Sequence, residues 1–229
     1  LILLVFATAV SAFAVDAPAP TKQSTLALPR IFGDHMVLQA GQPAPIWGTG
    51  SSGDTITVEF AGQKKSTAVS PNGHWRVDLD ALPASVETHE LTVTSANLKS
   101  GIENRKFSDV LVGEVWLCSG QSNMEFQLIT ANNGDLEVSA ANHPNIRLVR
   151  VKEPGSQTPV EDFKGEWKVC TPKSAAGFSA VGYFFGRELN EQLNVPIGLI
   201  DDSWGGSSCE AWIRRDRMEG KPLYDELIK

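Results

Sequence analysis

The first part of the chain carries the alternation of apolar and polar positions that is typical of β-strands. Four segments alternate or run apolar and are rich in β-branched and aromatic residues: 46–50, 55–60, 74–79 and 90–94. Turn-forming residues separate them: 50–54, 61–64 and 70–73. No long helical period interrupts this region. Short strands at regular spacing predict a β-rich module of the sandwich or jelly-roll type over residues 26–108.

The pattern changes after this module. Three apolar runs are typical of strands buried on both faces of a parallel sheet: 110–118, 145–151 and 195–200. Between the last two, apolar residues recur at three- and four-residue steps over 178–193, which predicts a helix that Ser179 caps. Another helix is expected to begin at 209–213. This order predicts an α/β domain over 109–229 with a doubly wound parallel sheet, incomplete at its C-terminal end.

The start of the chain predicts an export signal. Residues 1–10 are apolar, and 12–14 fit a small-residue cleavage site, so 1–14 is expected to be a signal peptide whose basic n-region is missing. A proline-containing linker follows over 15–25. The alternative, a membrane anchor, needs about 20 apolar residues, and this run is shorter. We expect an exported protein, periplasmic, extracellular or lysosomal depending on its source, that has no membrane contact after cleavage.

Charge and cysteine content exclude some partners. The formal net charge is -7, and the basic pairs Lys64-Lys65 and Arg214-Arg215 are isolated, so we expect no nucleic-acid partner. The three cysteines lack the spacing of a zinc site, and no metal is expected. In an exported protein an odd count leaves one free thiol or a partner outside this chain; a Cys118–Cys209 disulfide and one that uses Cys170 are both possible, and the sequence leaves the choice open.

Two polar loops follow predicted strands and therefore lie where open α/β sheets hold their sites. The first contains Ser119, Gln121, Ser122 and Asn123, and the second is the run 205–208, Gly-Gly-Ser-Ser. A serine nucleophile needs a base and donors for an oxyanion, and glycine backbone beside a helix start supplies such donors. The same residues are also common turn material.

Two other motifs are absent. Residue 124 is Met, so the Gly-x-Ser-x-Gly elbow of ordinary α/β-hydrolases fails, and no Gly-Lys-Ser/Thr marks a phosphate loop.

Several segments of the sequence resemble those of a known family. "WLCSGQSNMEF" at 116–126 and "GLIDDSWGGSSCEAWI" at 198–213 resemble the sialate O-acetylesterase family, a branch of the SGNH hydrolases. Upstream, "IFGDHMVLQ" and "PIWGTG" resemble the β-rich N-terminal region of that family, and "FSAVGYFFGREL" resembles the helix before its second motif. The likeness runs from about residue 28 to the last residue. It implies an SGNH-like sheet behind a β-rich module.

The resemblance also implies roles for residues. Ser122 would be the nucleophile, and its own N–H with Gly206, or Gly205 as the alternative, would form the oxyanion hole. Gln121 and Asn123 would shape the loop. The reaction would remove an O-acetyl group from a sugar through an acetyl-enzyme, with no metal or organic cofactor. Sialic acid is the leading substrate; acetylxylan or another polysaccharide is the alternative, because related acetylxylan esterases share the first motif.

The catalytic base is missing from the sequence. The family places another oxyanion donor in a Gln-Gly-Glu motif and its base in a later Asp-x-x-His, and neither occurs here. The four histidines are interpreted as surface or turn residues: His35, His74, His89 and His143. We therefore expect the front part of a longer enzyme that is inactive alone. The alternative of another class is a glycan-binding protein without turnover.

Some residues near the second loop have competing interpretations. Asp201 and Asp202 are adjacent on a strand, so we expect one to act as a turn or helix-start ligand and the other to be solvated. Trp204 and Trp212 would line the core or a pocket wall, or stack on a sugar ring.

Overall fold

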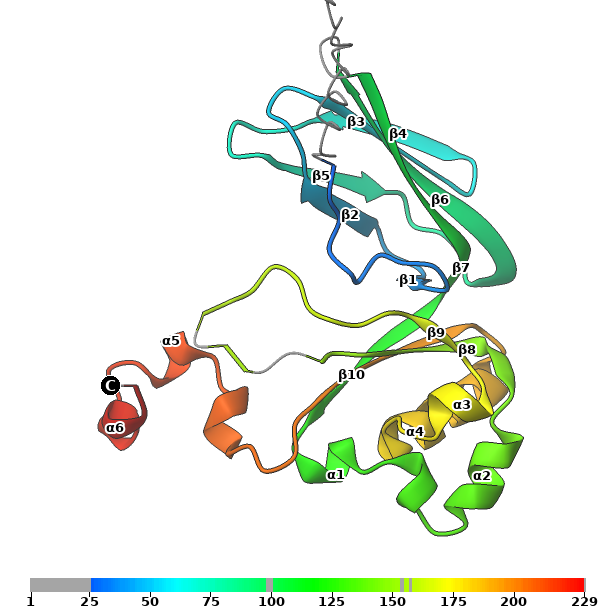
Figure 1. The fold of residues 1–229 in the computed structure, drawn as a ribbon, viewed down its shortest axis with the longest axis vertical. Helices are drawn as coiled ribbons and strands as arrows, with labels where there is room; N and C mark the ends of the chain where they lie inside the picture. The colour runs from blue at the N-terminus through cyan, green and yellow to red at the C-terminus, as the bar shows by residue number, and fades with distance from the viewer. Residues whose placement is uncertain (1–25, 98–100, 153–154, 157, 229) are drawn as a thin grey trace, which may run out of the picture.

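The computed structural model describes residues 26–97, 101–152, 155–156 and 158–228. The expected signal peptide and most of the linker lie outside these residues. The described chain has a β-rich part and an α/β part, joined by the long strand β7, Gly101–Gly120 (Figure 1). Both parts share one mixed sheet of eight strands, in the order β4-β3-β6-β7-β10-β8-β9, with β1 paired beside β7.

The β-rich part contains the alternating strands expected from the sequence. Its strands are β1 Val37–Gln39, β2 Ala44–Thr49, β3 Thr55–Phe60, β4 Gln63–Ala68, β5 His74–Leu79 and β6 Ser85–Asn97. β2 and β5 form a separate antiparallel pair. Every second residue of β3 and β5 is buried, and these residues belong to one apolar core with those of β2 and β6. Alternation therefore places one face of each strand in this core.

Strand β4 corrects one expectation. The sequence predicts a turn over 61–64, but only Ala61 and Gly62 form it, both with positive φ, and β4 begins at Gln63. β4 lies at the end of the sheet, and none of its residues is fully buried. A polar, lysine-containing strand at an exposed edge buries little apolar surface, so its sequence carries a weak strand signal.

The α/β part contains the three predicted parallel strands. β8 His143–Arg150 and the C-terminal half of β7 flank β10 Ile197–Ser203, and the short β9 Lys168–Cys170 is antiparallel to β8. Consecutive residues of β8 face different cores. Leu148 packs in the core beneath the helices, and Val149 packs in the core shared with the β-rich part. Burial on both faces explains why these strands are continuous apolar runs.

The helices α1 to α4 lie together on one side of the parallel strands (Figure 1). They and the shorter helical turns of this region are α1 Ser122–Glu125, η1 Leu128–Thr130, α2 Gly134–Ala140, α3 Pro172–Ala175 and α4 Ala180–Leu193. After β10 come η2 Cys209–Trp212, α5 Arg215–Met218, η3 Pro222–Tyr224 and α6 Asp225–Ile228. The helix expected from 209 is thus a single 3₁₀ turn, whereas the helix expected over 178–193 is confirmed as α4.

A buried arginine ties the two parts together at the middle of β7. Arg147 of β8 donates to both carboxylate oxygens of Asp109, at 2.5 and 3.1 Å, and its side chain is only 4% exposed. Asp109 Oδ2 also accepts from His35 Nδ1 at 2.6 Å, and Asp109 has φ 55°, in the left-handed region. The carboxylate is thus shared between the turn before β1 and the parallel sheet.

The cap predicted for α4 is confirmed. Ser179 is fully buried, its Oγ accepts the N–H of Gly182 at 3.0 Å, and it lies 3.4 Å from the sulfur of Met124. We expect Ser179→Ala to lower the free energy of unfolding by about 1 kcal/mol, because the helix loses one of its capped donors. Urea unfolding measures this, and Ser179→Thr, which keeps a capping hydroxyl, should lose less. Equal stability of Ser179→Ala and the parent would contradict the cap's contribution.

The three cysteines are all present as free thiols. Cys118 and Cys170 are buried free thiols, and Cys209 is an exposed one. Burial raises the pKa of both buried thiols to about 11, so they are unreactive near neutral pH.

Within the described ranges, no helix has the length and apolarity to cross a membrane.

Candidate functional site

The register of two parallel strands brings the two polar loops together. In the β7–β10 pair, Ser119 lies opposite Asp202 and Gly120 opposite Ser203. The chains therefore leave the sheet at the same level, and Trp204 N–H donates to Gly120 O at 2.9 Å just beyond it. Both loops lie at the carboxyl ends of their strands, the position at which open α/β sheets hold their ligands.

The first loop presents its hydroxyl to the surface. Ser122 is the first residue of α1, and its Oγ donates to Oε1 of Gln121 at 2.9 Å. Gln121, Ser122 and Asn123 are all exposed. Gly120 has φ 140°, a conformation that disfavours a side chain, and it turns the chain sharply off the strand. The hydroxyl predicted as the nucleophile is thus accessible and bonded to one neighbour.

The second loop passes directly beside Ser122. A methyl group built on Gly205 would lie 3.6 Å from Ser122 Cα and only 2.3 Å from Oε2 of Glu125, so a side chain here would force the Glu125 carboxylate to move. Gly206 differs, because it has φ 78° and its methyl would meet open space. Gly205 is therefore needed for close approach, and Gly206 for its backbone conformation.

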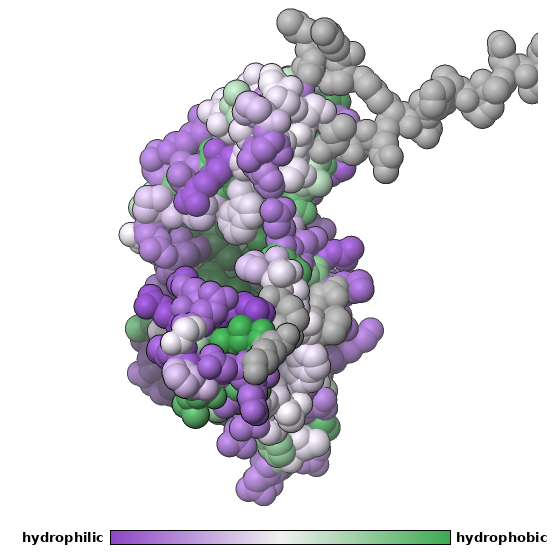
Figure 2. Space-filling model, turned by 90° about the vertical axis from the view of Figure 1, so that its left-hand side faces the viewer, coloured by the Kyte–Doolittle hydropathy of each residue, from purple (hydrophilic) through white to green (hydrophobic). Residues whose placement is uncertain are grey.

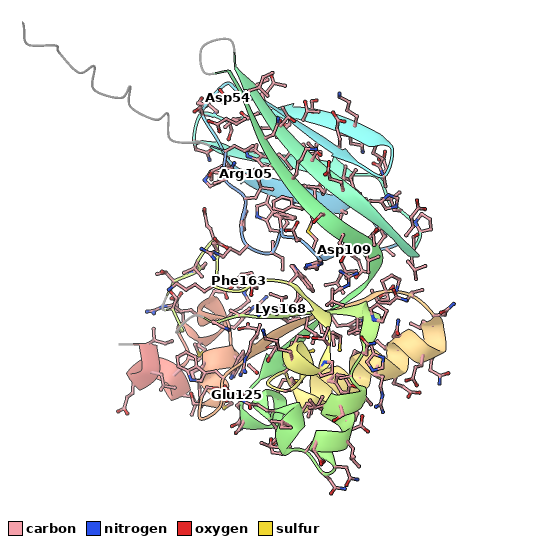
Figure 3. The ribbon with its side chains drawn as sticks, turned by 45° about the vertical axis from the view of Figure 1, so that its right-hand side comes forward. Asp54, Arg105, Asp109, Glu125, Phe163 and Lys168 are labelled. Carbon is pink, nitrogen blue, oxygen red and sulfur yellow. The ribbon has the colours of Figure 1, made fainter. Side chains whose placement is uncertain are left out.

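The structure adds three charged residues that the sequence analysis did not assign to the site. Glu125 accepts the N–H of Gly205 at 2.8 Å through Oε2 and pairs through Oε1 with Arg150 at 3.2 Å. Figure 3 shows Glu125 well away from the junction residue Asp109, at the far end of β7. Arg150 Nε also lies 3.4 Å from Oδ2 of Asp201. Glu125 lies within the quoted motif, but nothing local indicated that Arg150 would reach it.

The carboxylate pair on β10 differs from its interpretation. Asp201 is completely buried, its Oδ1 accepts from Ser203 Oγ, and Asp202 is half-buried. Neither is therefore a solvated turn residue. Burial raises the pKa of both carboxyls, while Ser203 and Arg150 oppose the rise at Asp201. Adjacent strand residues do face opposite sides, but both sides of this strand are covered.

None of the four histidines bonds to Ser122. His35 bonds to Asp109, and His143 lies 3.2 Å from the hydroxyl of Tyr183. His143 begins β8 instead of lying in a polar loop, and burial lowers its pKa. His74 begins β5 and His89 lies in β6, both in the β-rich part. The described residues thus bring the serine and the glycine loop together without a histidine base.

The cavities of the described chain lie at the junction of its two parts, and neither is lined by a residue of the two polar loops. A hollow separates the two parts of the molecule in the space-filling view, apolar in its depth and polar at its rim (Figure 2). Two cavities of about 670 and 500 Å³ share lining residues near the junction, and Arg150 lines the smaller one. Trp204 and Trp212 are 49% and 37% exposed, which excludes a core position for either. Among the described residues, no cluster of three or more His, Cys, Asp and Glu could hold a metal ion.

Comparison of the sequence with known proteins shows to which family this chain is similar. Residues 112–229 match the family model described as carbohydrate esterase, sialic acid-specific acetylesterase. The sialate O-acetylesterase of Rattus norvegicus is 36% identical over 206 residues, which cover 81% of this chain and 37% of that protein. The sialate O-acetylesterase of Homo sapiens is 37% identical over 200 residues, covering 78% of this chain and 37% of that protein.

A solved structure agrees with these relatives. A carbohydrate acetylesterase from Xanthomonas citri superposes with a TM-score of 0.79 at 38% sequence identity, covering 89% of this chain and 45% of that one. The chain thus spans 37% of the length of the curated relatives it matches. Because the family model covers more than half of the chain, and includes both loops, this protein belongs to the carbohydrate esterase family of sialic acid-specific acetylesterases.

Proposed function

We propose that this chain carries the nucleophile and one side of the oxyanion hole of a carbohydrate O-acetylesterase. The observation that carries the proposal is the contact between the Ser122 loop and the Gly205–Gly206 turn at the carboxyl ends of two parallel strands, in a member of this family. The names of the relatives favour O-acetylated sialic acid as substrate. Acetylated xylan or another acetylated polysaccharide is the alternative of the same class.

The proposed reaction has two steps. Ser122 Oγ attacks the acetyl carbonyl, its proton goes to a base, and the sugar hydroxyl leaves with a proton. The N–H of Ser122 and that of Gly206, or of Gly205, stabilise the oxyanion that forms in between. Water then attacks the acetyl-enzyme, releasing acetate and restoring the serine. Since none of the four histidines contacts Ser122, the base is a group other than these.

The finer assignments of fold and location belong to the same proposal. We infer an SGNH-hydrolase-like domain from residue 109 and a sandwich-like module before it. The close packing of β2 and β5 against the core of the larger sheet supports the module. We also infer export, with 1–14 as signal peptide, because those residues have the apolar composition of such a segment.

Trapping the acyl-enzyme tests the proposal. The complete protein encoded by the gene is mixed with an aryl acetate or an O-acetylated sialic acid, quenched within one turnover, and digested for mass spectrometry. We expect one acetyl group on the peptide that contains Ser122. Turnover without an acetyl group at Ser122 would contradict the mechanism.

The same experiment separates the rival function. Saturable binding of the sugar without release of acetate would favour a glycan-binding protein. Comparing kcat/KM for O-acetylated sialic acid and acetylated xylo-oligosaccharides then distinguishes the substrate classes.

A further inference from the structure

We propose that Glu125, held by Arg150, is a positioning residue that fixes the Gly205–Gly206 turn against Ser122 and leaves the N–H of Gly206 as the oxyanion donor of this turn. The inference rests on the proposed function and deepens it. It decides between two glycines that motif resemblance leaves open. It also assigns a role to an ion pair that no part of the proposed mechanism uses.

The N–H of Gly205 already has a hydrogen-bond acceptor. It donates to Glu125 Oε2 at 2.8 Å, within the usual range for a bond to a carboxylate. A donor engaged by a carboxylate is not free for an oxyanion. The N–H of Gly206 is the next along the turn, and this residue is exposed with a positive φ of 78°. Fixing Gly205 therefore selects Gly206.

The second step is the rigidity of Glu125. Its other oxygen pairs with Arg150 at 3.2 Å, and Arg150 is itself held on two further sides. Its Nη1 donates to Gly177 O at 3.0 Å, and its Nε lies 3.4 Å from the fully buried Asp201. Asp201 Oδ2 has no hydrogen bond, so the ion pair with Arg150 is its compensation. The carboxylate of Glu125 is thus held by a guanidinium that two further contacts keep in place.

The third step is the charge beside the nucleophile. A methyl group on Gly205 would touch both Glu125 Oε2 and Ser122 Cα, so the carboxylate lies close to the backbone of the proposed nucleophile. An unpaired carboxylate there would repel the negative charge that develops on the substrate. Arg150 offsets that charge. The pair therefore positions the turn while adding little net charge to the site.

A mutant cycle in the complete protein tests these steps. Glu125→Ala removes the acceptor, so kcat should fall about 10- to 100-fold while KM changes less than about 2-fold, because the oxyanion donor is displaced. Glu125→Gln keeps an acceptor oxygen for Gly205 and should lose less than about 10-fold. Arg150→Met leaves a carboxylate without its counter-ion and should lose more than Glu125→Gln. The double variant Glu125→Gln/Arg150→Met should recover several-fold over Arg150→Met alone.

The control is another Arg–Glu pair of similar exposure. Glu137 pairs with Arg187 at 2.6 Å, with side chains 29% and 31% exposed, on the helices α2 and α4. Glu137→Ala should leave kcat unchanged. Affinity for a tetrahedral phosphonate analogue of the acetyl ester should fall in parallel with kcat for Glu125→Ala, whereas a purely structural defect would lower the active fraction and the Tm instead. An unchanged kcat in Glu125→Ala overturns the proposal.

Hydrogen exchange provides a readout that needs no activity. The Gly205 amide should exchange slowly in the parent protein and in Ser122→Ala, and faster in Glu125→Ala, because only the last loses the acceptor. Activity retained by Ser122→Ala would refute the proposed function, not the clamp. Fast exchange at Gly205 in the parent protein would refute the clamp, whatever the activity.

Discussion

Replacing Ser122 by alanine is expected to lower kcat for hydrolysis of acetyl esters by at least about 10³-fold in the complete protein. The change removes only the hydroxyl group, and in the proposed mechanism the oxygen of this group forms the covalent bond to the acetyl group. Ser122 is exposed and its Oγ donates to the exposed Gln121, so folding should be unaffected. Steady-state kinetics with an aryl acetate, together with the Tm of each protein, measure both effects.

A serine of the neighbouring loop provides the matched control. Ser208 is also exposed and lies just before η2, yet the proposed mechanism gives its hydroxyl no part. Ser208→Ala should therefore keep kcat near that of the parent. If Ser122→Ala hydrolyses acetyl esters as fast as Ser208→Ala does, Ser122 is not the nucleophile and the glycan-binding interpretation gains support.

Replacing Asp109 by asparagine is expected to lower the free energy of unfolding by about 2 to 3 kcal/mol at neutral pH. The change removes the charge that compensates Arg147, whose side chain is 4% exposed, but keeps the size of the residue. Asparagine also tolerates the positive φ of this position, so backbone strain should contribute little. The estimate is below the ~3–5 kcal/mol of a fully buried pair because Asp109 is 30% exposed. Urea unfolding measures the difference.

The effect should depend on pH in a defined direction. Hydrogen bonding to Arg147, then to His35, lowers the pKa of Asp109 below its usual value of 3.8, against the opposing effect of burial. A carboxyl with a lowered pKa stabilises the fold fully above 3.8, and this stabilisation is lost as the pH falls through the lowered pKa. The difference between the parent and Asp109→Asn should therefore be constant near neutrality and shrink below 3.8.

An exposed pair separates burial from charge. Asp78 pairs with Arg76 at 2.8 Å, but the two side chains are 52% and 63% exposed. Asp78→Asn should change stability little, because water screens the pair. Equal losses in Asp78→Asn and Asp109→Asn would mean that the junction contributes no more than an ordinary surface contact.

Local patterns in the sequence were sufficient for the elements that bury a regular face. β3 and β5 begin and end where alternation predicted, and the recurrence of apolar residues located α4 together with its cap Ser179. Strands and helices of this kind are specified by residues a few positions apart, so a short window contains the signal. The polar edge strand β4 was missed because none of its residues is fully buried.

The candidate site was likewise predictable from the sequence only in part. Ser122 and the Gly205–Gly206 turn could be proposed from the sequence, because each lies in a recognisable motif after an apolar strand. The approach of Gly205 to Glu125 and the reach of Arg150 to both Glu125 and Asp201 could not. These contacts join residues on three different elements, and only the register of β7, β10 and β8 brings them together.

The sequence by itself determined where strands and helices with a regular buried face form, because such periodicity is a local property, and its motifs predicted which side chains carry the proposed acetylesterase chemistry. Only the tertiary structure decided which groups those side chains meet. Arg147 of β8 bonds to Asp109 of β7, and Gly205 donates to a carboxylate 80 residues earlier in the chain. Such pairings depend on strand order and register, which are set by the packing of the whole sheet.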